Sequence, residues 1–258
     1  MRPLAVELRE VHKSFGKTPI IRGARLQVPQ GERFAMIGPN GAGKTTLFNL
    51  ISGRFGPTSG DILLKGESIA GLKSFEINRR GLARSFQITN IFPRLSVFEN
   101  LRCAVLWSLG YRYSFWNRLR GLKDARERAE AVLEQTGLTP RRGTLAGLLP
   151  YAEQRALEIG ITVAGGADVI LLDEPTAGMS RSESDAAVEL IRKVTTGKTL
   201  LMVEHDMGVV FGLADKIAVV VYGEVIACDS PVNVRNDPAV QEAYLGSHVA
   251  KKVAKVPA

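Results

Sequence analysis

A glycine-rich segment near residue 40 has the residue types and spacing of a phosphate-binding loop. It matches the pattern Gly-x-x-x-x-Gly-Lys-Thr in full. The segment and the next residue comprise Gly38, Pro39, Asn40, Gly41, Ala42, Gly43, Lys44, Thr45 and Thr46. The glycines let backbone N–H groups face phosphate oxygens, and the positive end of the following helix adds to this attraction. We expect Lys44 to reach the outer phosphates of a nucleotide and Thr45 to bind Mg²⁺.

An acidic pair follows a strongly apolar run further along the chain. The run 169–172 reads as a buried strand, and Asp173 and Glu174 stand at its end. A carboxylate in this position is suited to holding the Mg²⁺ shell of a phosphate loop, which is the role expected of Asp173. Glu174 would act as the general base that orients or deprotonates an attacking water. Such a pair can also serve only to cap the next helix, but the loop favours the catalytic interpretation.

The elements around these residues predict an α/β fold. Strands and helices alternate after residue 164, which is typical of a mostly parallel sheet, whereas helical signals dominate between residues 88 and 164. The expected strands are 4–11, 20–28, 33–37, 61–64, 82–86, 169–172, 199–203 and 216–222. The expected helices are 44–52, 74–80, 124–136, 153–163 and those that begin after Ser96, Ser180 and Asp206.

With the loop and the acidic pair in this order, the chain resembles the ABC-type ATPases from about residue 4 to residue 246. The resemblance implies a P-loop NTPase fold, an ABC-type nucleotide-binding domain with an N-terminal antiparallel β region and an inserted helical sub-domain. The expected division is an ATPase core at 1–87 and 165–246, a helical sub-domain at 88–164 and a flexible tail at 247–258. The implied cofactors are ATP and Mg²⁺, and the implied activity is ATP hydrolysis coupled to transport.

The resemblance assigns roles to three further residues. In this family a glutamine joins the core to the helical sub-domain and contacts Mg²⁺ and water, and Gln87 stands at that junction. A histidine after a later strand contacts the γ-phosphate, and His205 matches it; without the family context, a surface histidine at a helix start would be the better interpretation. An aromatic residue before the loop stacks on adenine, and Phe15 matches it, although a core phenylalanine is nearly as good an interpretation.

The segment 149–154 departs from the family pattern. ABC ATPases hold each ATP between one subunit's loop and the other subunit's signature segment, usually Leu-Ser-Gly-Gly-Gln. Pro150 and Ala152 replace the serine and a glycine, with Tyr151 and Glu153 beside them. One interpretation is that the proline simply fits the first helical turn, so the helix end still points at phosphate. The interpretation favoured here is that the chain contributes a weakened half to its partner's ATP site.

Other segments narrow the resemblance to one group of importers. The stretches 38–53, 84–89, 173–179, 203–212 and 243–246 are similar to the larger ATPase subunit of branched-chain and hydrophobic amino-acid uptake systems. This similarity implies a peripheral subunit on the cytoplasmic face of the inner (plasma) membrane. The implied partners are a second ATPase subunit, two membrane permease subunits and, indirectly, an external substrate-binding protein. The alternative is a homodimeric ATPase of a lipid or polysaccharide exporter, while a single phosphate loop disfavours a soluble ABC protein acting on nucleic acid.

Composition is that of an ordinary globular protein, with 45% hydrophobic and 23% charged residues. No apolar run is long enough to span a bilayer. The start of the chain has charged residues where a signal peptide needs an apolar run, so export is not expected. The two cysteines lie far apart in the sequence, which indicates a reducing compartment. The net charge of +8 identifies no partner, because a lysine-bearing tail supplies part of it, and no nucleic-acid module accompanies it. The basic aromatic segment 111–123 could contact anionic lipid or the membrane subunits, or only pack on the helical sub-domain.

Overall fold

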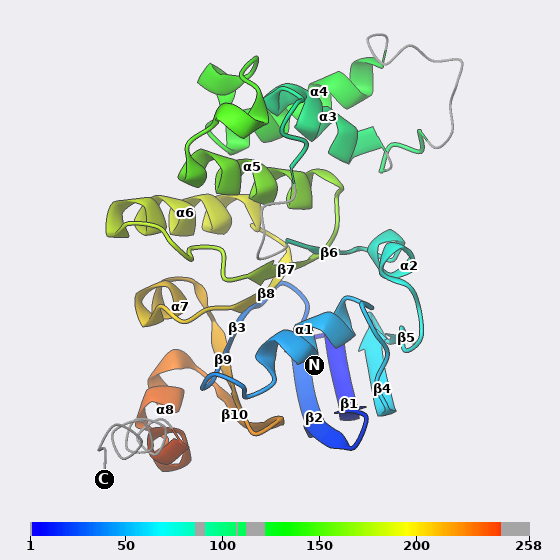
Figure 1. Ribbon diagram of the computed structural model, residues 1–258, viewed down its shortest axis with the longest axis vertical. Helices are drawn as coiled ribbons and strands as arrows, with labels where there is room; N and C mark the ends of the chain where they lie inside the picture. The colour runs from blue at the N-terminus through cyan, green and yellow to red at the C-terminus, as the bar shows by residue number, and fades with distance from the viewer. Residues whose placement is uncertain (1, 86–90, 107, 112–121, 244–258) are drawn as a thin grey trace. The chain divides into compact units, whose positions relative to one another are not determined.

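The computed structural model describes residues 2–85, 91–106, 108–111 and 122–243 (Figure 1). The chain divides into two compact units. Unit 1 comprises Met1–Arg80 and Thr199–Ala258, and unit 2 comprises Gly81–Lys198. The expected division at residues 87, 164 and 246 stays a prediction. Gln87, residues 112–121 and the tail 247–258 lie outside the described residues, so the expectations for them stay untested.

The first sheet of unit 1 is antiparallel and forms the expected N-terminal β region. Its strands lie in the order β2-β1-β4-β5, and helix α2 (Ser74–Arg79) follows them in the chain. Their bounds are Leu4–Phe15 for β1, Thr18–Pro29 for β2, Ser59–Leu64 for β4 and Glu67–Ser68 for β5. The buried side chains Val6, Leu8 and Val11 of β1 supply its apolar face. The short strand β5 was not expected from the sequence.

The second sheet of unit 1 carries the phosphate loop. Strand β3 (Arg33–Ile37) pairs in parallel with β8 (Thr199–Val203) and β9 (Lys216–Val221), while β10 (Glu224–Asp229) pairs antiparallel with β9. β3 and β8 are apolar and largely buried along their length, as parallel strands covered on both faces require. The helices of this part include α1 (Lys44–Ile51), α7 (Met207–Leu213) and α8 (Pro231–Asn236), and residues 238–243 are helical as well. The sequence pattern missed β10 and α8.

Among its described residues, unit 2 has one parallel strand pair and four α-helices. β6 (Leu82–Arg84) pairs with β7 (Val169–Asp173). The helices are α3 (Val97–Leu106), α4 (Lys123–Gln135), α5 (Tyr151–Ala164) and α6 (Arg181–Val194), with single 3₁₀ turns at Thr139–Arg141 and Ala146–Leu148. Helix α5 packs against α3, α4 and α6, and Figure 1 shows the green helices α3, α4 and α5 grouped together. Helix α5 is therefore the central helix of this unit.

Two capping boxes confirm the expected starts of α3 and α6. The Ser96 hydroxyl accepts from the Glu99 N–H at 3.1 Å, and the Glu99 carboxylate accepts from the Ser96 N–H at 3.0 Å. Ser180 and Glu183 repeat the arrangement, and hydrogen bonds from the Ser180 hydroxyl and N–H lower the pKa of the Glu183 carboxyl. These local signals were readable because each involves residues three positions apart.

Within the described residues, no helix is long and apolar enough to cross a membrane.

Candidate functional site

The phosphate loop lies between β3 and α1, as its sequence predicts. Gly43 is the N-cap of α1 and has a φ of 104°, a left-handed conformation that favours glycine. The Lys44 side chain is buried and folds back over the loop, where its Nζ donates to the Gly38 carbonyl at 2.7 Å and the Pro39 carbonyl at 3.0 Å. The exposed Thr45 occupies the second position of the helix. A helix N-terminus with an ammonium group beside it is suited to binding an anionic phosphate.

The loop is held in a fixed place by the strand β9 and the turn that follows it. The Gly223 N–H donates to the Ala42 carbonyl at 2.9 Å, and the Arg22 N–H donates to the Gly223 carbonyl at 3.0 Å. Gly38 has a φ of 153°, and a Cβ built on it would lie 2.0 Å from the Val220 carbonyl oxygen. No side chain fits there without moving the backbone of β9. This first glycine is therefore required by close backbone approach as well as by phosphate binding.

Replacing Gly38 with Ala is expected to destabilise the protein by more than about 2 kcal/mol, because the backbone of β9 must move away from the loop in addition to the conformational cost at a positive φ. Gly41→Ala is the matched control: its φ is 81°, but its Cβ would meet nothing within 4 Å, so it carries only the left-handed conformational cost of about 1–2 kcal/mol. Urea unfolding of both variants measures the difference. Equal free energies of unfolding for the two variants would show that the contact with Val220 does not matter.

His205 follows β8 at the edge of the sheet where the loop follows β3. Met36 and Val203 are register partners in the parallel pair, so both strands end at the same edge. The His205 side chain is exposed, and the backbone N–H of His205 donates to the Glu204 carboxylate at 3.0 Å. Asp206 caps α7 by accepting from the Gly208 N–H at 2.7 Å. The backbone at His205 is thus held at this sheet edge with an exposed imidazole, and the contact of that imidazole with a γ-phosphate stays a prediction.

Phe15 ends β1 with half of its surface exposed, at 50%. Its ring lies edge-on to the Phe55 ring, with centroids 5.3 Å apart. The Lys13 ammonium is 5.2 Å from the Phe15 centroid and donates to the Gly56 carbonyl at 2.7 Å. The core interpretation of Phe15 is therefore wrong, because a core phenylalanine would be buried. Stacking on adenine stays a prediction that this exposure allows.

Asp173 stands at the carboxyl end of β7 in unit 2, as expected, and is paired with an arginine that the sequence interpretation missed. Arg84 Nη2 lies 2.8 Å from Asp173 Oδ2, and both side chains are buried. Arg84 ends β6, which pairs with β7 in a register that places Arg84 opposite Leu171. Such a partner compensates the charge of a buried carboxylate. The signal was an arginine inside the expected strand 82–86, but nothing local linked it to Asp173.

Glu174 adopts an unusual backbone conformation immediately after β7. Its φ is 47°, which is strained for a residue with a Cβ. The guanidinium of Arg155 on α5 donates to the Glu174 carbonyl at 2.9 Å and contacts the Asp173 carbonyl at 3.4 Å. Sequence reasoning missed Arg155 as well. Its signal was an arginine inside the amphipathic helix with Glu158 three residues later, a spacing that brings the two side chains together.

The signature segment forms the beginning of α5. The helix starts at Tyr151, two residues earlier than expected, and Pro150 is its N-cap rather than part of the first turn. The Pro150 carbonyl accepts the first helical hydrogen bond from the Gln154 N–H at 2.9 Å, so the missing proline N–H costs the helix nothing. Ala152 lies in the first turn, and Glu153 pairs with Arg141 at 2.9 Å. A regular helix N-terminus is therefore preserved despite the altered residues.

The donors present fit a Mg²⁺ ion that takes few protein ligands. Mg²⁺ prefers oxygen ligands and usually keeps several waters and substrate phosphates in its shell. Thr45 in unit 1 is exposed and carries a hydroxyl, and Asp173 in unit 2 carries a carboxylate. Among the described residues, no cluster of three or more His, Cys, Asp or Glu side chains could form a metal cage. A metal bound mainly by nucleotide and water is the kind that these residues can support.

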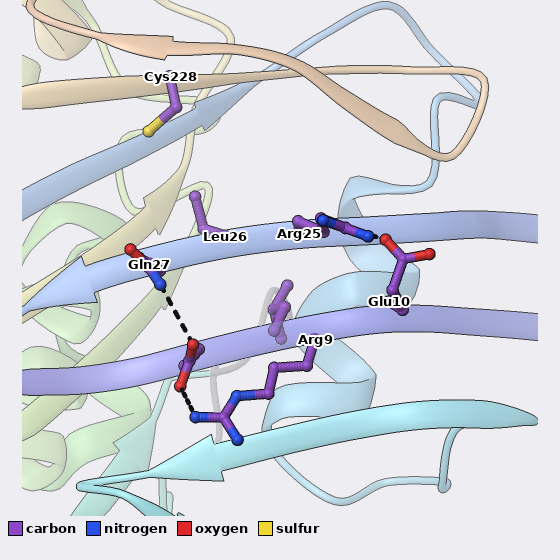
Figure 2. A pocket seen from close by; sticks show the side chains of 8 residues that line it. Arg9, Glu10, Arg25, Leu26, Gln27 and Cys228 are labelled. Carbon is purple, nitrogen blue, oxygen red and sulfur yellow. Dashed lines mark hydrogen bonds and ion pairs between the residues drawn. The ribbon is translucent and has the colours of Figure 1, made fainter.

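Each unit also has a groove. The first, of about 630 Å³, lies in unit 1 against β1, β2 and β10, with Cys228 at its margin (Figure 2). Its charged side chains pair with each other, Arg9 with Glu7 at 2.7 Å and Arg25 with Glu10, and the bond from Arg9 lowers the pKa of the Glu7 carboxyl. The second, of about 590 Å³, lies in unit 2 between α5, α6 and the 3₁₀ turn that begins at Thr139. The first groove holds none of the predicted site residues, and the second includes only Ala152 and Glu153 of the signature segment.

Comparisons with known proteins identify the family of the chain. The family model "ABC transporter" matches residues 21–177, and the model "Branched-chain amino acid ATP-binding cassette transporter" matches residues 224–250. The high-affinity branched-chain amino acid transport ATP-binding protein BraF of Pseudomonas aeruginosa is 37% identical over 257 residues, with 95% of this chain and 98% of that protein covered. The corresponding protein LivG of Escherichia coli is 36% identical over 241 residues, with 90% and 94% covered.

Solved structures of ATP-binding cassettes from ABC transporters have the same fold as this chain. The ADP conformation of an ATP-binding cassette of an ABC transporter superposes with a TM-score of 0.81 at 27% identity, and covers 94% of this chain and 99% of that one. A nucleotide-free cassette superposes with a TM-score of 0.80 at 26% identity, and covers 93% and 98%. The relatives by sequence and the relatives by structure are therefore both ABC transporter ATP-binding proteins, and both match nearly the whole chain.

Proposed function

The chain belongs to the ATP-binding proteins of the ABC transporter family and has their cassette fold, and we propose that it hydrolyses ATP to drive amino-acid import. The observation that carries the proposal is the phosphate loop: a complete motif at the start of α1, with the Lys44 ammonium held over it. The match of residues 224–250 to the branched-chain amino acid cassette model favours an importer over the lipid or polysaccharide exporter. Branched-chain amino acids are the proposed substrate, and they do not contact this chain.

ATP binding is assigned to the loop residues and to Phe15. The loop N–H groups and the start of α1 receive the phosphates, and Lys44 exchanges its bonds to the Gly38 and Pro39 carbonyls for the outer phosphates. Phe15 offers an exposed ring face on which adenine stacks. When bound, Mg²⁺ neutralises phosphate charge; Thr45, Asp173 and Gln87 are the residues proposed to hold it.

Hydrolysis is assigned to two residues at strand ends. Glu174 accepts a proton from the attacking water or orients it, because its carboxylate is the acidic group next to the Mg²⁺ ligand in sequence. His205, exposed at the end of β8, donates a hydrogen bond to the γ-phosphate. The Arg84 guanidinium, 2.8 Å from Asp173 Oδ2, compensates the charge of the carboxylate and holds it in place as a ligand.

The signature segment is proposed to serve the partner's ATP with reduced strength. Pro150 supplies neither the hydroxyl nor the N–H of the usual serine, and Ala152 adds a methyl group where a glycine would allow closer approach. The N-terminus of α5 is regular, so its helix dipole remains available to phosphate, with Tyr151 and Glu153 in the first turn. This combination supports an asymmetric pair of ATP sites, with the intact catalytic set on this chain.

The proposed assembly has this chain on the cytoplasmic face of the inner membrane. A second, different ATPase subunit and two membrane permease subunits complete it, and an external binding protein delivers the substrate. ATP binding closes the two ATPase subunits, and this closure shifts the permease between conformations. The relatives named BraF and LivG are themselves high-affinity branched-chain amino acid transport proteins, which supports this assignment.

Affinity purification from native membranes in mild detergent tests the proposal. We expect the tagged chain to recover membrane permease subunits and a second ATPase, and deletion of its gene to abolish uptake of radiolabelled leucine. The matched control is the same purification with the Lys44→Ala variant, which should still recover the permease because Lys44 belongs to the nucleotide loop. Recovery of no permease, together with unchanged leucine uptake in the deletion strain, would contradict the importer function.

A further inference from the structure

Arg155 is the largest of the fully buried side chains among the described residues, with 2% of its surface exposed. It lies on α5, directly after the signature segment 149–154 and one turn after Tyr151, where the helix starts. A guanidinium is strongly disfavoured in such a place unless its charge is compensated and its donors are used. Its position therefore demands specific partners.

The partners of Arg155 are one carboxylate and the backbone at the end of β7. Nη1 lies 2.6 Å from the Glu158 carboxylate, which is also buried and compensates the charge. Nη2 donates to the Glu174 carbonyl at 2.9 Å and contacts the Asp173 carbonyl at 3.4 Å. The planar fork of an arginine suits this division, because one side meets a carboxylate and the other meets the main chain.

Arg155 donates to the carbonyl of Glu174, and the backbone of Glu174 is strained. Glu174 has a φ of 47°, and it is one of four non-glycine residues with positive φ in the part of the chain that the structure describes. A left-handed conformation costs free energy for a residue with a Cβ and persists only when its surroundings stabilise it. A charge-assisted hydrogen bond to the Glu174 carbonyl provides such stabilisation.

The same face of α5 makes a second contact with this segment. The Tyr151 hydroxyl donates to the Ala177 carbonyl at 3.0 Å, and Tyr151 precedes Arg155 by one helical turn. Residues four apart lie on one face of a helix, so α5 holds the segment after β7 near both of its ends. The start of α5, where the signature segment lies, is thus joined by one rigid helix to the backbone of Glu174.

We infer that Arg155 is a positioning residue for ATP hydrolysis: it fixes the Glu174 main chain in the left-handed turn and thereby sets the position of the general base. The inference rests on the proposed function, in which Glu174 is that base. Since Arg155 and the signature segment share α5, a movement of α5 caused by nucleotide at its N-terminus is transmitted to Glu174. One helix therefore links the ATP held by the signature segment to the catalytic glutamate of the other ATP site.

The test replaces Arg155 and Glu158 together, as Arg155→Met with Glu158→Leu, so that no buried charge is left without its partner. We expect the Kd for ATP, measured with a fluorescent ATP analogue, to stay within about twofold of wild type. The kcat for hydrolysis should fall on the order of tenfold to a hundredfold, because the base is misplaced while the phosphate loop is intact. Arg155→Lys, which keeps a charge and a donor, should recover part of the kcat.

Leu157→Ala is the control for lost stability, since Leu157 is fully buried on the same helix and carries no hydrogen-bonding group. Its kcat per folded molecule should remain near that of wild type. A wild-type kcat in the double variant, or an equal loss of kcat in Leu157→Ala, would overturn the positioning role. If circular dichroism shows the double variant unfolded, Arg155→Lys decides, and an unchanged kcat overturns the role. A wild-type chain that neither binds nor hydrolyses ATP would instead overturn the proposed function.

Discussion

Glu174→Gln is expected to bind ATP with nearly wild-type affinity and to lose at least about a hundredfold in hydrolysis rate. The amide has the size of the carboxylate but cannot accept the proton of the attacking water. The backbone bond from Arg155 to the Glu174 carbonyl does not depend on the side chain, so the left-handed turn should be retained. Phosphate release under saturating ATP and Mg²⁺ measures the rate, and equilibrium binding of a fluorescent ATP analogue measures the affinity.

Glu189→Gln is the matched control for this change. Glu189 lies on α6, is exposed and pairs with Arg192, so losing its charge should leave hydrolysis unchanged. A wild-type rate for Glu174→Gln would remove the general-base assignment.

The Glu174→Gln variant also tests whether the ATPase partner is a second copy of this chain or a different subunit. If it dimerises with itself in ATP by light scattering, a homodimer is favoured; if it dimerises only when the second ATPase is added, the proposed heterodimer is supported.

Lys44→Ala is expected to weaken ATP binding by roughly tenfold to a hundredfold, the equivalent of one lost charge-assisted hydrogen bond of about 1.5–3 kcal/mol. Hydrolysis should become undetectable, because the outer phosphates lose the group that neutralises them. The substitution also removes the two bonds to the Gly38 and Pro39 carbonyls, so the loop should loosen. Isothermal titration with Mg·ATP measures the affinity, and urea unfolding reports whether the fold is retained.

Lys193→Ala is the control for the loss of one positive charge. Lys193 is exposed in the last turn of α6, far along the chain from the loop, and its removal should leave ATP affinity unchanged. An unaltered affinity in Lys44→Ala would end the assignment of the glycine-rich segment as the nucleotide site. Equal losses in both variants would indicate that net charge, rather than the Lys44 position, governs binding.

The amino-acid sequence by itself determined the features that depend on neighbouring residues. The phosphate loop, the N-cap position at Gly43 and the capping boxes of α3 and α6 are encoded within a few residues, because helix starts and tight loops use local hydrogen bonds. The buried strands before the loop and before Asp173 were equally readable, since parallel strands are apolar along their length. The family resemblance followed from these motifs and their order.

Only the tertiary structure decided which distant groups meet. Arg84 and Asp173 are separated by 89 positions, and Arg155 and Glu174 by 19, so no periodic pattern links either pair. The left-handed turn at Glu174 and the close approach of Gly38 to Val220 likewise depend on chain segments that pack from elsewhere. The physical reason is that a buried charge or a strained backbone is stable only where its surroundings compensate it, and those surroundings are assembled by folding.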